Sequence, residues 1–112
     1  MRYEEIDDII LIRLPREVNV AETTEFSNLC EFFLQKGFSK FVIDFFEVKF
    51  ISSAFLSVLV AMKKRLFLST GNVVLVNLSP SVYKILEITD LLSFFDIFSS
   101  QEEGIDYFNR VI

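Results

Sequence analysis

The 112-residue sequence contains no histidine and only one cysteine, Cys30. Without an imidazole, the chain has no histidine base, no histidine metal ligand and no phosphohistidine relay. A single cysteine excludes an internal disulfide, a CxxC redox pair and a cysteine zinc cluster. Glycine is also scarce, with three residues, and neither GxxxxGK[ST] nor GxGxxG occurs. We therefore predict a protein without a bound metal or cofactor.

Positive charge and long apolar runs are lacking as well. Eleven basic residues against sixteen acidic residues give a net charge of −5, which argues against nucleic acid as a partner. The richest apolar stretch, residues 55–62, ends at three basic residues and is far shorter than the roughly 20 residues of a spanning helix. The first ten residues are acidic, unlike a secretory signal. We expect a cytoplasmic protein with no membrane insertion.

Apolar residues, in contrast, are plentiful. They make up 52% of the chain and charged residues 24%, a balance typical of a globular protein. The length is below the roughly 150 residues used as a prior for one domain, so we predict a single domain over residues 1–112. Fourteen phenylalanines are more than so small a core hides, and some are expected at a contact surface, including one between two copies of the chain.

Strand-like and helix-like patterns alternate along the sequence. Continuous apolar runs predict strands, and apolar residues at helical spacing, preceded by capping residues, predict helices. Strands are expected at residues 9–14, 41–45, 48–51, 73–76 and 94–98, and helices at about 19–37, 54–68, from 79 and from 100. This alternation indicates an α/β protein with parallel crossovers and room for an antiparallel edge strand. Cys30 lies on the apolar stripe of the first helix and is expected to be a buried thiol.

Two serines separate the strand near residue 51 from the helix that follows. Ser53 should lie at or just before the helix N-terminus. One interpretation makes Ser53 only a cap, whose oxygen accepts a hydrogen bond from a first-turn amide. Another makes it a phosphorylation site, because a helix N-terminus offers free N–H groups and a positive dipole to a phosphate. The residues alone leave both interpretations open.

The apolar arc of the same helix is about 200° wide, whereas one sheet contact needs roughly 100°. The surplus flank, Phe55, Val58 and Met62, is either an extension of the core or a docking surface. The basic run at residues 63–65 and the acids of residues 4–8 are interpreted as solvated surface.

The segment FISSAFLSVLV, residues 50–60, resembles the signature of the STAS domain family. The segments at residues 16–19, 42–50, 74–80 and 86–89 are similar to further family elements in the same order. The resemblance implies a mixed β-sheet of four to five strands flanked by about four helices. It points to the bacterial anti-sigma factor antagonists of the family.

The resemblance also implies a partner and a switch. The partner is an anti-sigma factor that is also a serine kinase, and its phosphorylation of the signature serine, here Ser53, ends the interaction and so regulates sigma-factor-dependent transcription. The residues implied for partner binding are Glu17, Asn19, Ser52, Ala54, Phe55, Val58 and Met62. The sequence departs from the signature at Ser52, where the family commonly has aspartate, and at Phe55 and Ser57, where it usually has glycine.

The residues disfavour two other classes of function, catalysis and the binding of a small molecule or nucleotide, and for the second no GxxxxGK[ST] or GxGxxG phosphate loop is present. Catalysis by Ser52 or Ser53 would need a base, yet no GxSxG elbow is present and Lys63 and Lys64 lie about three turns away. We therefore predict that the protein is not an enzyme. The remaining alternative is a STAS scaffold or adaptor of a regulatory or transport assembly that is never phosphorylated.

Overall fold

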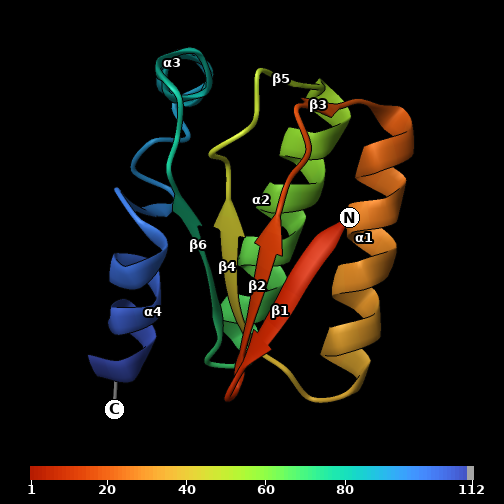
Figure 1. Ribbon diagram of the computed structural model, residues 1–112, viewed down its shortest axis with the longest axis vertical. Coiled ribbons are helices and arrows are strands. Elements are labelled where there is room, and N and C mark those ends of the chain that lie inside the picture. Colours follow the sequence, from red (N-terminus) through yellow and green to blue (C-terminus); the bar gives the residue numbers. More distant parts are fainter. Residues whose placement is uncertain (111–112) are drawn as a thin grey trace.

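Figure 1 shows the computed structural model of the protein, which describes residues 1–110. The elements in chain order are β1 (Arg2–Ile6), β2 (Ile9–Arg13), β3 (Glu17–Val18), α1 (Val20–Gln35), β4 (Lys40–Asp44), β5 (Phe50–Ile51), α2 (Ser53–Leu68), β6 (Asn72–Val76), α3 (Pro80–Ile88), β7 (Asp96–Phe98) and α4 (Gln101–Arg110). A five-stranded sheet has the order β1-β2-β4-β6-β7. Only β1 is antiparallel to its neighbour. The predicted α/β fold with a mixed sheet is confirmed.

The central strands are apolar on both faces because helices cover both. Ile10 and Ile12 of β2 belong to the larger core, with residues of α1 and α2. Ile9 and Leu11, which alternate with them, belong to a smaller core that includes Phe108 of α4. In Figure 1, α3 lies beyond the carboxyl ends of the strands, and α4 is separated from the α1–α2 pair. The protein therefore has three layers.

The edge strand β1 has no apolar alternation in the sequence, and the acids of this region were expected to be plain solvated surface. In the structure they flank or belong to a strand whose residues are largely exposed. Glu4 pairs with Arg13 at 3.6 Å, and Asp8 pairs with Lys40 at 2.6 Å. Charged residues on an edge strand prevent pairing with other chains, and they also hide the strand from a periodicity argument.

The remaining predictions of helix starts, strand bounds and burial agree with the structure, apart from small differences at the ends of elements. Ser79 caps α3 and Pro80 opens it, as the sequence indicated. The strand expected at 94–98 covers only Asp96–Phe98. Cys30 is buried, as expected. Some phenylalanines are exposed at the surface, as expected: Phe32, Phe46, Phe50 and Phe67.

Candidate functional site

The N-terminus of α2 is positioned by a second, two-stranded sheet. β3 and β5 are parallel, with Glu17 opposite Phe50 and Val18 opposite Ile51. The ladder continues one residue further, because the amide of Ser52 donates to the carbonyl of Val18 at 3.0 Å. This pairing brings the turn before α1 beside the turn before α2. Glu17 and Asn19, predicted from a distant part of the sequence, thus lie close to the two serines.

Ser52 is the cap of α2. Its Oγ accepts a hydrogen bond from the amide of Phe55 at 3.2 Å. The hydroxyl of Thr23, a buried residue of α1, lies 3.4 Å from the same Oγ and donates to the carbonyl of Asn19 at 2.7 Å. These contacts tie the first turns of α1 and α2 together and occupy the Ser52 hydroxyl.

Ser53 is the first residue of α2 and is exposed. The interpretation that Ser53 serves only as a cap is wrong, because the chain is still extended at Ser52 and the capping bond is made there. Ala54, the next residue, is exposed too. Ser53 therefore presents its hydroxyl to solvent at the positive end of a 16-residue helix.

Two residues of the predicted contact surface are in the core instead. Phe55 is 0% exposed and Met62 is 5% exposed. The ring of Phe55 packs edge-on against Phe26 and Phe45, with centroids 5.0 and 6.2 Å apart. Positions seven residues apart share one helix face, and this face points to the sheet. The Phe55 ring therefore points away from the surface on which Ser53 is displayed.

The remaining predicted contact residue on the apolar flank of α2 lies only partly at the surface. Val58 is half-buried in a groove of about 180 Å³ between α1 and α2. The sequence reasoning missed Val20 and Phe50, which are exposed beside Asn19 and Ser52 in the chain. The excess of phenylalanine in the sequence was a signal for Phe50, and nothing in the sequence reasoning pointed to Val20. We call the exposed residues at this end the α2-start surface: Glu17, Asn19, Val20, Phe50, Ser53 and Ala54.

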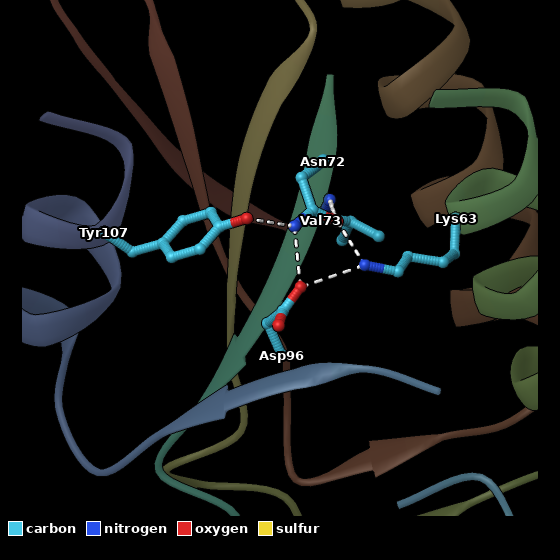
Figure 2. Close-up of polar contacts among 5 residues, drawn as sticks. All are labelled: Lys63, Asn72, Val73, Asp96 and Tyr107. Atoms are coloured by element: carbon cyan, nitrogen blue, oxygen red, sulfur yellow. Dashed lines mark hydrogen bonds and ion pairs between the residues drawn. The ribbon is translucent and has the colours of Figure 1, made fainter. Parts of the chain in front are cut away.

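A separate polar cluster lies near the amino ends of β6 and β7 (Figure 2). Lys63 Nζ donates to Asn72 Oδ1 at 2.5 Å and to Asp96 Oδ2 at 3.0 Å. Asn72 Nδ2 donates to Asp96 Oδ2 at 2.8 Å and to Tyr107 Oη at 2.9 Å. The expectation that Lys63 is a solvated residue is wrong, since its side chain is 16% exposed and is held by these partners.

The cluster joins α2, β6, β7 and α4. Burial acts to raise the pKa of the Asp96 carboxyl, but the hydrogen bonds from Asn72 and Lys63 outweigh it, and the pKa is lowered. Among the described residues, no buried side-chain polar atom lacks a partner. The polar groups of the cluster thus find their hydrogen-bond partners within it, and these bonds hold α2, β6, β7 and α4 together. We call this cluster, Lys63, Asn72, Asp96 and Tyr107, the polar clamp.

Residues 1–110 contain no group of three or more acidic, histidine or cysteine side chains arranged to hold a metal. Over the same range, no helix is long and apolar enough to cross a membrane.

The STAS domain family model matches residues 1–104, so the chain belongs to the STAS domain family. BtrV of Bordetella bronchiseptica, provisionally assigned as an anti-sigma factor antagonist, is 29% identical over 112 residues, covering 100% of this chain and 97% of BtrV. A Thermotoga maritima protein with the same provisional assignment is 27% identical over 109 residues, or 96% of each chain. By homology, the chain falls among the anti-sigma factor antagonists of the family.

Solved structures agree with this placement. A crystal structure of a Thermotoga maritima protein, also provisionally assigned as an anti-sigma factor antagonist, matches with a TM-score of 0.88 and 26% identity, over 97% of this chain and 94% of that chain. The anti-sigma factor antagonist SpoIIAA, in its unphosphorylated form, matches with a TM-score of 0.86 over 99% of this chain and 97% of that chain. SpoIIAA is 18% identical, so it shows the shared fold.

Proposed function

We propose that this protein is a single-domain, cytoplasmic anti-sigma factor antagonist that binds an anti-sigma factor with serine kinase activity. In the proposed cycle, the α2-start surface contacts the kinase, and the sigma factor is released for transcription. The kinase then transfers the γ-phosphoryl group of ATP to Ser53 Oγ, which loses its proton, and ADP leaves. The phosphorylated protein dissociates. The protein itself acts by binding and carries out no catalysis.

The observation that supports this most is the difference between the two serines. Ser52 is used as a cap, with its oxygen engaged by Phe55 and close to Thr23. Ser53 is exposed at the helix N-terminus. The structure therefore favours Ser53 as the acceptor, even though Ser52 replaces the usual aspartate. Phe55, a second departure from the signature, points inward and leaves Ser53 accessible.

The energetics favour a switch that spares the fold. A phosphate at an exposed helix N-terminus is stabilised by about 0.3–1 kcal/mol. A phosphoserine carries about −1.5 to −2 charges, and burying that charge in an interface without a cation costs several kcal/mol. A penalty of about 4 kcal/mol weakens binding by about a thousandfold. SpoIIAA has been solved in unphosphorylated and phosphorylated forms, and both share the fold of this chain, with TM-scores of 0.86 and 0.78.

The test is the substitution Ser53→Asp. We expect binding to a serine-kinase anti-sigma factor to weaken by about a hundredfold or more, on the same charge argument, while the melting temperature stays nearly unchanged. Titration calorimetry measures the first quantity and circular dichroism the second. With ATP and the kinase, mass spectrometry should place one phosphoryl group on Ser53 and none on Ser52.

Ser81→Asp is the matched control, because Ser81 is an exposed serine in the first turn of a different helix, α3. It should bind the kinase like the unaltered protein. If Ser53→Asp binds as tightly as this control, the switch is refuted and the unphosphorylated adaptor function takes its place.

A further inference from the structure

The far end of α2 carries two adjacent, exposed apolar side chains. Phe67 is 79% exposed and Leu68 is 86% exposed, although Leu66 beside them is buried. With half-buried Phe94, they line a surface hollow of about 390 Å³. We call this the α2-end hollow; it is lined by Lys63, Lys64, Phe67, Leu68 and Phe94. Single exposed apolar residues are ordinary, but adjacent ones that line one depression indicate a contact site.

The charged residues that line the hollow, Lys63 and Lys64, are both basic. Helix α2 contains Lys63, Lys64 and Arg65 and no acidic residue. Arg65 is neutralised by Glu31 of α1 at 2.6 Å, and Lys63 is neutralised by Asp96 at 3.0 Å. Within residues 1–110, Lys64 forms no ion pair and is exposed. The hollow therefore combines an apolar wall with an unneutralised ammonium group, in a chain whose net charge is −5.

This charge distinguishes between possible occupants. A symmetric contact between two copies would place the same lining in one interface twice, and because that lining contains no carboxylate, neither Lys64 ammonium would be neutralised there. Like charges at an interface are unfavourable. An apolar segment with its own carboxylate would instead cover Phe67 and Leu68 and also neutralise Lys64.

We propose that the α2-end hollow binds a short segment of a partner protein in which apolar residues stand next to an aspartate or glutamate. This contact is separate from the proposed switch. Ser53 and Leu68 are the first and last residues of α2, so at 1.5 Å per residue they are about 22 Å apart along the helix axis. The partner at the hollow is thus expected to remain bound when Ser53 carries a phosphate.

The test uses a library of random 12-residue peptides displayed on phage. Peptides are enriched on the full chain and counter-selected on the double variant Phe67→Ser/Leu68→Ser. We expect the enriched peptides to contain at least two large apolar residues beside an acid. A synthetic peptide of the enriched sequence should shift the amide NMR signals of residues 63–68 and 94. Its affinity should fall at least tenfold with Phe67→Ser and with Lys64→Glu.

Phe46→Ser provides the matched control, because Phe46 is also highly exposed, at 77%, but lies outside the hollow. Both Phe46→Ser and Ser53→Asp should leave the peptide affinity unchanged. All variants change exposed residues, and circular dichroism should show unchanged melting.

Several results would overturn the proposal. The selection could yield no peptide that distinguishes the protein from the double variant, or it could enrich peptides that contain no acidic residue. Phe46→Ser could also lower the peptide affinity as much as Phe67→Ser does. Sedimentation that shows a dimer dissociated by Phe67→Ser would also overturn it, because the occupant would then be a second copy. The switch at Ser53 is measured with the kinase alone, so either proposal can fail without the other.

Discussion

Two neighbouring serines with the same side chain have different environments in this protein. Ser52 is the last extended residue before α2 and uses its oxygen to cap the helix. Ser53, one residue later, has helical geometry and an exposed side chain. A helix cap must accept from an amide two or three positions ahead, so only one of the two can serve. The other is left available to a partner or an enzyme.

Cys30 shows the opposite outcome, a reactive group made inert by its surroundings. Burial raises the pKa of its thiol to about 12, with a smaller contribution from the charge of Glu31. Because the thiolate is the reactive form, we expect Ellman's reagent at pH 8 to label the native protein about a thousandfold more slowly than the urea-unfolded protein. Labelling at comparable rates would show that the thiol is accessible.

The same shift has a consequence for stability. The folded state holds the thiol proton of Cys30 more tightly than the unfolded state does, and this difference contributes to the free energy of unfolding. The contribution is fully present below the pKa of the unfolded thiol, about 8.5. It is lost as the pH rises from there toward 12. Cys30→Ala should therefore remove part of the alkaline decline of the free energy of unfolding.

At the scale of elements, the polar clamp fixes how α2 meets the edge of the sheet. β7 has only three residues and pairs with β6 alone, so its hydrogen-bonded hold on the sheet is limited. Asp96, its first residue, is bonded to both Lys63 of α2 and Asn72 of β6. These side-chain hydrogen bonds help the short β6–β7 pairing to hold β7 on the sheet.

Lys63→Met tests the clamp through its pH dependence. The pKa of Asp96 is lowered in the folded protein, so its contribution to stability is present above the carboxyl's ordinary pKa and is lost as the pH falls through the lowered value. Without the Lys63 ammonium, the pKa of Asp96 in the folded protein is lowered less. Urea midpoints measured from pH 6 to pH 2 should thus fall less steeply for Lys63→Met than for the unaltered protein.

Lys64→Met is the matched control, since Lys64 is the next residue and is exposed outside the clamp. It should keep the original pH dependence. Parallel pH profiles for Lys63→Met and the unaltered protein would contradict a role for Lys63 in holding Asp96.

For the whole molecule, the third layer depends on a close approach of α4 to the sheet. Gly104 is buried, and a Cβ built there lies 2.8 Å from Cγ1 of Val76 and 3.2 Å from Cγ1 of Val42. Both valines belong to central strands, so neither backbone has room to retreat. The lack of a side chain at residue 104 allows Ile105 and Phe108 to cover the face of the sheet opposite α1 and α2.

Gly104→Val should therefore destabilise the protein by about 1–3 kcal/mol, the usual cost of overpacking. Urea denaturation measures this, and Asp106→Val, on the exposed side of α4, controls for helix propensity. Equal losses in the two variants would show that α4 is loosely packed.

Much of the fold was predictable because its core strands are continuously apolar and its helices carry recognisable caps. The family signature also pointed to the serine pair, which the structure places at the start of α2. The prediction for Phe55 and Met62 was wrong because periodicity defines an apolar arc but not which part of it faces the sheet. Strand β1 was missed because its solvent-exposed, charged residues resemble a loop.

The sequence by itself determined the class of fold, the absence of histidine chemistry and the serine pair at a helix start, since all three follow from residue type and local order. Only the tertiary structure decided which serine is exposed, that Lys63 is neutralised while Lys64 is not, and that Phe67 and Leu68 remain uncovered. These features depend on contacts between residues far apart in the chain, such as Thr23 with Ser52 and Lys63 with Asp96. A local pattern carries no information about such contacts until the chain has packed.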